Sequence, residues 1–392
     1  MTPLDRLDRD DLAAALRELG ADGWLLFDFH GVNPVPRQIL GLQGMATRRL
    51  FVYLPARGEP VAVAHKIELG PLAGFPGRIL PYARWQELEA GLREVVGGKT
   101  VAMEVFPEDG VPYLDRVPHG VVQFLERLGT RVVPSAPLVS RFAARWSAED
   151  LEDHRAAAEI LAEVARGELA RTVGLAGTGL RETEVQARVV AACRERGLVF
   201  DTLPIVGFGP NAANPHYEPA AGHDAVLEPG QVVLLDLWAG RRLGAVFADQ
   251  TWMGVAAAEP AAEVETVWTA VRDARDAAIA AVRAGAAAGS PITGAEADGA
   301  ARRVIEAAGY GEYFVHRTGH SIDHDLHGSG PHLDGYETND GRRLVPGVGF
   351  SVEPGIYLPG RFGVRSEVNV HLGEAGPEVT PRVPQVDLIL AR

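Results

Sequence analysis

Residues 316–332 read HRTGHSIDHDLHGSGPH and hold five of the twelve histidines in the chain. Acidic residues stand in apolar surroundings on both sides of this stretch. Asp236 lies in VLLDLWAG and Asp249 in VFADQTW, while Glu353 lies in SVEPGIY and Glu367 in GVRSEV. One imidazole and four carboxylates suit two hard-to-borderline divalent ions. The sequence therefore predicts a dinuclear metallohydrolase.

The two aspartates fall in strand-like segments, VVLLDLWAG and AVFADQTW, which are joined by the turn-like RRLG at 241–244. A hairpin that closes symmetrically on those four residues places Asp236 and Asp249 opposite each other, with Cβ atoms about 5 Å apart. Two desolvated carboxylates so placed repel each other, and a bound cation removes that cost. For either aspartate alone, an exposed position at a strand end is the alternative.

The two glutamates repeat the pattern. SVEPGIYL and FGVRSEVNV flank residues 359–361, so a second hairpin brings Glu353 across from Glu367. One such glutamate alone would be better explained as an exposed strand residue. Two hairpins that each pair carboxylates favour a metal site.

The histidine spacing is ambiguous. His316, His320 and His324 are four residues apart, as on one face of a helix, but the glycine and β-branched residues between them disfavour a helix. Arg317 also stands where the zincin helix motif needs a glutamate. We predict one histidine ligand, with others as proton shuttles or substrate donors. His324 is assigned to the surface in preference to the ligand shell, and His332 is expected in a loop without a role.

The chain is long enough for two domains, and its pattern changes near residue 146. Residues 1–145 predict an alternating α/β domain, with helices in DRDDLAAALRELG, LEAGLREVVGG and VVQFLERLG. Its predicted strands are GWLLFD, RRLFVYLP, PVAVAH and TVAMEVF. In residues 146–392, Ser147 and Asp150 form a capping-box signature before a long helix, and VETVWTAVRDARDAAIAAV predicts a second. Strands and turns are expected after about residue 312.

Bulk composition excludes several classes. A net charge of −14 argues against a nucleic-acid surface. No apolar run reaches the roughly 18 residues of a membrane span, and the start, MTPLDRLDRDDL, has no secretory signal pattern. Cys193 is the single cysteine and is predicted to pack in the core, which fits a cytoplasmic protein.

Five residues occur in the order and settings of the pita-bread metallopeptidases (family M24), which the chain resembles: Asp236, Asp249, His320, Glu353 and Glu367. This family includes methionine aminopeptidases, Xaa-Pro aminopeptidases and Xaa-Pro dipeptidases (prolidases). The resemblance covers roughly residues 146–392 and is clearest in GHSIDHDLH and VEPGIYLPGRFGVRSE. It implies an α+β fold with a C-terminal pita-bread catalytic domain.

The first 145 residues resemble, more weakly, the smaller α/β (creatinase-type) domain that precedes the catalytic domain in the Xaa-Pro enzymes. DFHGVNPVPRQILGL and TRRLFVYLPARGEP carry this likeness. Methionine aminopeptidases usually lack that domain, so the resemblance implies proline-specific cleavage.

The resemblance also implies roles for the ligands. Asp249 and Glu367 would bridge the two metals. His320 and Glu353 would complete the shell of one metal, and Asp236 would chelate the other. Manganese is the expected metal, with cobalt and zinc as alternatives, because carboxylates dominate and thiolates are absent.

Four further residues match family positions. His327 matches a proton-shuttling histidine, and His216, in NAANPHYEP, matches the histidine that polarises the scissile carbonyl. His316 falls where a histidine contacts substrate, and Arg365 where an arginine supports the bridging glutamate. Glu353 is our choice as general base.

Three features depart from the family pattern. Asp323 replaces a common glycine, and Val368 follows Glu367 where an aspartate is usual. The two aspartate ligands are thirteen residues apart, slightly wider than is typical. No ligand is lost, but the first two changes bear on substrate preference and on the surroundings of the ligands.

The expected reaction is hydrolysis of the peptide bond before proline by a metal-bridging hydroxide. Xaa-Pro dipeptides are the preferred substrate because the first domain is compact, and cleavage of longer peptides by an Xaa-Pro aminopeptidase is the alternative. A dipeptidase needs a cation for the free carboxylate, for which Arg37, Arg48 and Arg365 are candidates, although a solvated surface suits the first two better.

The fold also hosts metal-free amidinohydrolases and non-enzymatic binding scaffolds. Both are disfavoured here because all five ligands are present. The family implies a homodimer.

Overall fold

The computed structural model describes residues 4, 7–42, 44 and 47–391. The chain divides into two compact units, residues 1–143 and residues 144–392, whereas the sequence placed the boundary after residue 145. The acidic start at residues 1–12 lies partly outside the described residues. Each unit is organised around hydrophobic cores of its own.

The N-terminal unit is built on a six-stranded mixed sheet in the order β4-β3-β2-β1-β5-β6. Its strands are β1 (Gly23–Asp28), β2 (Leu50–Pro55), β3 (Val61–His65), β4 (Arg78–Tyr82), β5 (Thr100–Met103) and β6 (Arg131–Pro134). Its helices are α1 (Arg9–Leu19), α2 (Pro34–Leu40), α3 (Trp85–Val96), α4 (His119–Arg127) and the short α5 (Ala136–Leu138). The predicted helices and strands of this unit are confirmed, and the sequence pattern did not indicate α2, α5, β4 or β6.

Strand β1 is buried along its whole length because helices cover both faces of the sheet. Trp24 and Leu26 pack in the core beside α1 and α2, while Leu25 and Phe27 pack in the core beside α3 and α4. Successive side chains of a strand point to opposite faces, so an unbroken apolar run serves two cores at once. Gly20, with φ of 65°, ends α1 where the sequence predicted.

The C-terminal unit contains four helices and three small sheets within the described residues. The helices are α6 (Ala148–Val173), α7 (Glu182–Glu195), α8 (Ala262–Ala287) and α9 (Gly294–Ala307). The first sheet, in the order β16-β9-β8-β7, comprises β7 (Ile205–Phe208), β8 (Val232–Ala239), β9 (Ala248–Val255) and β16 (Ile389–Leu390). The second, in the order β10-β11-β14-β15, comprises β10 (Ser321–Ile322), β11 (Gly349–Val352), β14 (Val368–Gly373) and β15 (Gly376–Thr380). A two-stranded sheet pairs β12 (Gly355–Leu358) with β13 (Phe362–Arg365).

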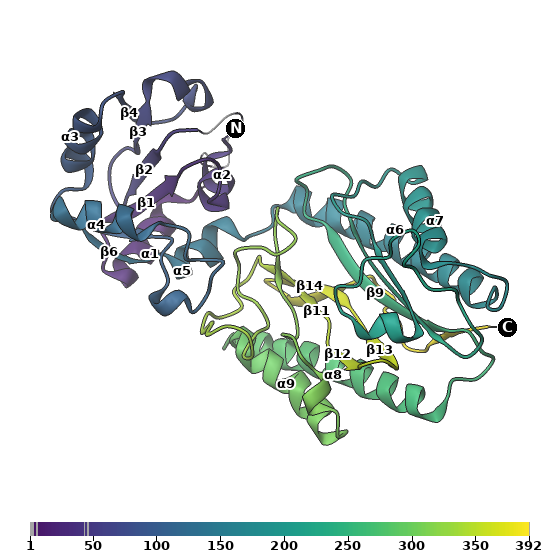
Figure 1. Ribbon diagram of the computed structural model, residues 1–392. Coiled ribbons are helices and arrows are strands. Elements are labelled where there is room, and N and C mark those ends of the chain that lie inside the picture. The colour runs from purple at the N-terminus through teal and green to yellow at the C-terminus, as the bar shows by residue number, and fades with distance from the viewer. Residues whose placement is uncertain (1–3, 5–6, 43, 45–46, 392) are drawn as a thin grey trace. The chain divides into compact units, whose positions relative to one another are not determined.

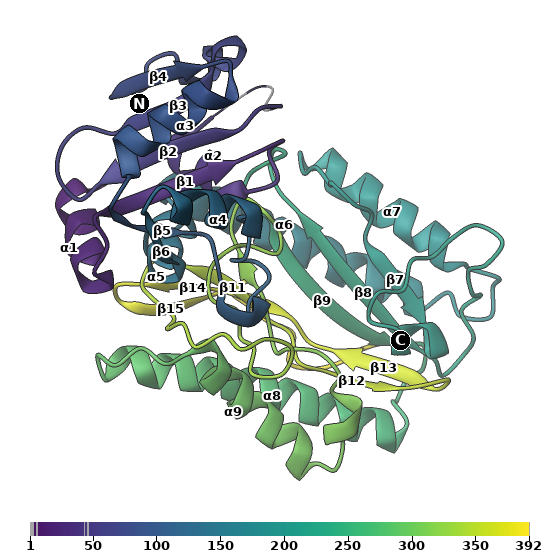
Figure 2. The ribbon, with the colours of Figure 1, turned by 60° about the vertical axis from the view of Figure 1, so that its left-hand side comes forward.

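These sheets lie between two layers of helices. Helices α6 and α7 cover the β7–β9 sheet on one side, and α8 and α9 lie against the strands after β10 on the other (Figures 1 and 2). The capping box of Ser147 and Asp150 starts α6 as predicted. The predicted second long helix is α8, with Val267, Trp268 and Val271 buried along one stripe.

The hairpin of β8 and β9 has a different register from the predicted one. Asp236 pairs with Thr251, and Asp249 pairs with Trp238, so the aspartates lie diagonally and not directly opposite each other. The connection is longer than a four-residue turn, since pairing ends at Ala239 and Ala248. A shift of two residues keeps every side chain on its predicted face, so the aspartates still share one face.

The second predicted hairpin has the expected register. Val352 pairs with Val368 before the strands separate, and Gly355 pairs with Arg365 after they meet again. Continuing either ladder places Glu353 level with Glu367. Both glutamates lie in the gap between the two ladders, where the backbone is free of strand pairing.

Among the described residues, none of the helices is long and apolar enough to cross a membrane. Cys193 is buried in the core between α6, α7 and the β7–β9 sheet, as predicted.

Candidate metal centre

Strand alternation explains where the ligands gather. On β8, Val232 and Leu234 precede Asp236 on one face, and on β9 Met253 and Val255 follow Asp249 on the same face. The apolar residues of this face belong to the core beside α8 and α9. The face is therefore apolar at one end and acidic at the other, and the acidic end points toward the strands that follow β10.

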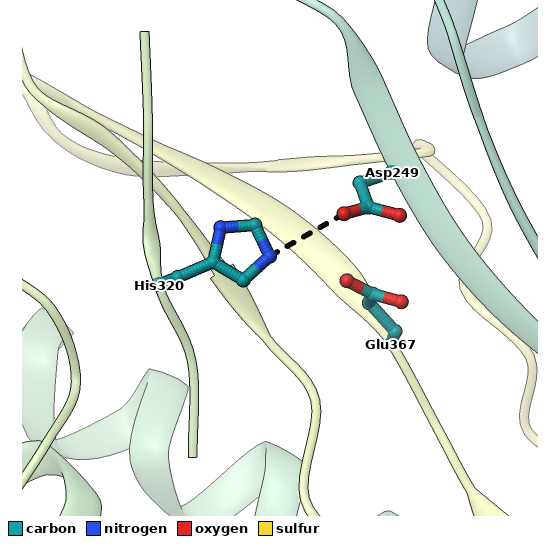
Figure 3. A group of neighbouring side chains, drawn as sticks. All are labelled: Asp249, His320 and Glu367. Carbon is teal, nitrogen blue, oxygen red and sulfur yellow. Dashed lines mark ion pairs between the residues drawn. The ribbon is translucent and has the colours of Figure 1, made fainter. Parts of the chain in front are cut away.

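Three predicted ligands converge in this space. Asp249, His320 and Glu367 each offer a ligand atom, and these atoms lie within 4.8 Å of one another (Figure 3). Glu353 joins them, because His320 Nε2 lies 3.4 Å from Glu353 Oε1 and 3.4 Å from Asp249 Oδ2. The trio is buried, so its charges are shielded little by solvent.

Asp236 lies beside this group but is hydrogen-bonded to Arg365 and Thr251. Arg365 Nη2 donates to Asp236 Oδ2 at 2.5 Å, and the Thr251 hydroxyl lies 3.2 Å from Asp236 Oδ1. Burial, with the charges of Asp249 and Glu353, raises the pKa of Asp236 to about 7 despite Arg365. The structure thus brings Asp249, His320 and Glu367 together, with Glu353 beside His320.

Electrostatics favours a cation here. Burial, followed by the charges of the neighbouring carboxylates, raises the pKa of Glu367 well above its ordinary value. Burial also raises the pKa of Asp249. Burial opposes ionisation of Glu353 too, but His320, His316 and Arg365 together hold its pKa below the ordinary value. A divalent ion would stabilise all three carboxylates in their charged form.

The orientation of the donor atoms fits a metal. His320 Nδ1 lies 3.1 Å from the Ser321 carbonyl, which orients the ring so that Nε2 faces two carboxylates. With a metal bound, the proton would stay on Nδ1 and Nε2 would offer its lone pair to the ion. Glu367 Oε1 is buried and has no hydrogen-bond partner among the described residues. Acceptor atoms that face one another without a donor between them are what a cation site requires.

Arg365, which the resemblance places in support of Glu367, donates directly to Asp236 and is linked to Glu367 through Thr251. Its Nε donates to Thr251 Oγ1 at 2.9 Å, and that hydroxyl lies 2.8 Å from Glu367 Oε2.

His316 belongs to a network that ends at Asp236. Its Nδ1 lies 2.7 Å from the Arg317 carbonyl, and its Nε2 accepts from the Tyr357 hydroxyl at 2.8 Å. The Tyr357 oxygen in turn accepts from Arg365 Nη1 at 3.1 Å. Burial lowers the pKa of His316, so its ring is held neutral and oriented.

The two other predicted histidines lie at the solvent side of the centre. The ring of His327 packs edge-on against the ring of His320, with 4.3 Å between centroids. The nearby charge of His320, together with burial, lowers the pKa of His327 to about 3, and His216 is close enough to contribute. Both His327 and His216 remain exposed, so both can meet a ligand that enters from solvent.

Two further histidines are also placed. His324 lies at the surface, as predicted, with Nδ1 3.0 Å from the Gly244 carbonyl. His332, which was given no role, is fully buried, and its Nδ1 accepts from the Ser321 backbone at 3.0 Å. It therefore holds the strand that begins directly after His320.

Sequence reasoning missed Thr251, Tyr357 and Asn369. Thr251 and Asn369 each stand two residues after a predicted ligand, a spacing that puts them on the same face of a strand. The Asn369 side-chain oxygen accepts from the Asp249 backbone at 2.8 Å. Tyr357 carried no such signal, because its contacts depend on how β12 and β13 pack.

Buried carboxylates around one imidazole, in a domain of this layered α/β architecture, define a metal-dependent hydrolase. Residues 152–374 match the model of metallopeptidase family M24, and the chain belongs to that family. It is 30% identical over 344 residues to the "Probable dipeptidase PepE" of Mycobacterium tuberculosis, covering 86% of this chain and 85% of that protein. It is 39% identical over 168 residues to an Xaa-Pro dipeptidase of Lactobacillus delbrueckii subsp. lactis, covering 43% of this chain and 41% of that enzyme.

The solved structure of dipeptidase PepE from Mycobacterium ulcerans superposes with a TM-score of 0.75 at 26% identity. The match covers 98% of this chain and 96% of that one. The predicted family, its two-domain pita-bread fold and its metallopeptidase class are therefore confirmed.

Proposed function

We propose that this enzyme hydrolyses the peptide bond before proline in Xaa-Pro dipeptides, with two divalent ions at the centre formed by Asp236, Asp249, His320, Glu353 and Glu367. The convergence of Asp249, His320 and Glu367 within 4.8 Å carries the proposal. When bound, two such ions lower the pKa of a shared water and so supply a nucleophile at neutral pH.

The protein side chains would divide the remaining work. Glu353, held by the Ser351 hydroxyl at 3.0 Å, would accept the proton of the attacking water. His327, open to solvent and packed on His320, would relay a proton to the departing proline nitrogen, donating from one ring nitrogen while the other accepts, as a neutral imidazole can. His216 would donate to the carbonyl oxygen as negative charge develops there. His316 and Arg365, linked through Tyr357, would orient the substrate.

The proposal also covers the identity of the metal, the oligomeric state and the cellular compartment. An oxygen-rich ligand set with one imidazole and no thiolate favours manganese. The homodimer rests on the family alone, and light scattering of the purified protein tests it. A single buried cysteine fits the cytoplasm.

The test measures proline release from an Xaa-Pro dipeptide and from an Xaa-Pro-Xaa tripeptide, after metal stripping and again after manganese is added back. We expect manganese-dependent cleavage of the dipeptide alone. Cleavage of the tripeptide would favour the alternative, an Xaa-Pro aminopeptidase, and cleavage of neither would reject proline specificity.

A pair of variants tests the general base. Glu353→Gln should lower kcat by about two to four orders of magnitude, whereas Glu265→Gln, an exposed position on α8, should leave it unchanged. A near-wild-type rate for Glu353→Gln would reject its role. Metal analysis of the wild-type protein separates the peptidase from a metal-free amidinohydrolase or binding scaffold.

A further inference from the structure

The loop that carries His327 follows β10 and closes on itself. The Gly328 backbone N–H donates to the Ser321 carbonyl at 2.7 Å. The His327 ring has no hydrogen-bond partner in the described part of the chain, and its one ring contact is with His320. The position of this imidazole is therefore set by the backbone around it.

Asp323 holds this loop from within. Its Oδ1 accepts from the Asp325 backbone at 2.8 Å, and its Oδ2 accepts from the Ser329 backbone at 2.9 Å. The side chain is only 2% exposed. It packs directly on Gly328, where an added Cβ would lie 2.7 Å from the carboxylate.

Arg342 holds the same loop from the other side. Its Nη1 donates to the Ser329 carbonyl and its Nη2 to the Gly330 carbonyl, both at 2.7 Å. Asp340 fixes the guanidinium, accepting from Nε at 2.9 Å and from Nη2 at 2.7 Å. Arg342 and Asp340 are both buried, so the geometry of the paired hydrogen bonds made by the guanidinium is fixed.

The backbone of Ser329 is therefore hydrogen-bonded on both sides: its N–H donates to Asp323 and its carbonyl accepts from Arg342. We propose that Asp323 and Arg342 are positioning residues that hold His327 against His320 for proton delivery. This inference rests on the proposed function, in which His327 protonates the proline nitrogen.

The expected kinetic effect follows from the geometry. Asp323→Asn keeps the shape of the side chain but turns an NH₂ toward one of two backbone N–H groups, so one end of the loop is released. A displacement of about 1 Å at a proton donor costs on the order of 100-fold in rate. We expect kcat to fall by about 10- to 100-fold, while KM stays within about threefold and metal content is unchanged.

A double-mutant cycle distinguishes positioning from general stability. The rates of wild type, Asp323→Asn, His327→Ala and the double variant are compared on the Xaa-Pro dipeptide. If Asp323 acts through His327, Asp323→Asn lowers kcat in the wild-type background and changes it by less than about twofold when His327 is absent. An equal factor in both backgrounds would overturn the proposal.

Asp334→Asn is the matched control. Asp334 is also fully buried and caps the next turn, accepting from the backbones of Tyr336 and Glu337 at 2.9 Å and 2.8 Å. Its loop carries no proposed proton donor, so kcat should stay within about threefold of wild type. If Asp323→Asn does not fold, Arg342→Lys replaces it in the same cycle. Lysine keeps the positive charge but cannot donate to the Ser329 and Gly330 carbonyls with two nitrogens at once.

Hydrogen exchange of the 324–330 segment gives a readout that needs no turnover. Asp323→Asn and Arg342→Lys should each speed exchange there, and Asp334→Asn should not. Unchanged exchange in both variants would overturn the proposal whatever the activity. A wild-type enzyme that released no proline would instead refute the proposed function, while exchange would still decide whether the two residues hold the loop.

Discussion

Glu182 is a buried carboxylate whose removal should loosen the loop that carries His216. The side chain is fully buried at the start of α7. Its two oxygens accept from four donors that follow one another along residues 208–225: the Phe208 backbone at 2.7 Å, Asn211 Nδ2 at 3.0 Å, the Tyr217 hydroxyl at 2.6 Å and the Ala225 backbone at 2.7 Å. One carboxylate therefore anchors the whole segment.

The magnitude can be worked out for Glu182→Gln. A hydrogen bond to a charged group contributes about 1.5–3 kcal/mol. Glutamine keeps one oxygen, but its NH₂ must face donors that the second carboxylate oxygen now accepts. Loss of about two such bonds lowers the free energy of unfolding by roughly 3–6 kcal/mol. With a urea m-value of about 3 kcal/mol/M, the midpoint falls by about 1–2 M.

The assay is urea unfolding of the metal-loaded enzyme, together with kcat/KM on the dipeptide. We expect the lower midpoint and, because His216 is no longer held, a loss of at least about tenfold in kcat/KM. The control is Glu184→Gln, an exposed capping residue on the same helix that accepts from the Arg181 backbone at 2.8 Å. If the two variants unfold at the same urea concentration and the Glu182 variant keeps its activity, the anchoring argument is refuted.

Three further outcomes are expected. Burial lowers the pKa of His154 to about 4, so the unfolded chain binds a proton there between pH 6.5 and 4 and the native protein does not. Acidification across that window should lower the free energy of unfolding by about 3 kcal/mol. Urea unfolding at a series of pH values should show a smaller loss in His154→Gln, and the same pH dependence in both proteins would contradict the argument. Chelation should lower the melting temperature, and manganese at about 100 times its Kd should restore about 3 kcal/mol, whereas an identical melting curve would argue against metal at the buried centre. Tyr357→Phe leaves His316 Nε2 without its donor, so KM should rise about tenfold with little change in kcat; an unchanged KM would remove His316 from substrate binding.

The sequence predicted the faces of the ligand strands better than their register. Alternation of side chains placed Asp236 and Asp249 on one face, and that holds for any even shift of the hairpin. The register itself depends on the length of the connection. Phe247 packs on Gly240, where a Cβ would lie 2.4 Å from the ring, so the connection is wider than the RRLG turn suggests. Such a contact has no signature in a local pattern.

The sequence predicted the candidate ligands of the site, but it did not predict the contacts that hold these residues and the His327 loop in position. Asp323 was noted only as a departure from a family pattern, yet it accepts from two backbone groups of the His327 loop. Arg365 was assigned to Glu367 but donates to Asp236, which lies 129 residues away in the chain. Metal ligands are recognisable because their residue types are restricted, whereas supporting contacts depend on which segments the fold brings together.

The distance along the chain between Asp249 and Glu367 has a consequence for folding. More than one hundred residues separate these two carboxylates, one on β9 and the other between β13 and β14. An ion held by both acts on the unfolded chain as a removable cross-link. In the chain-entropy description, closing a loop of this size corresponds to about 5 kcal/mol. The catalytic metal would therefore also close a loop of more than one hundred residues, and without it the two hairpins would have to come together with no such cross-link.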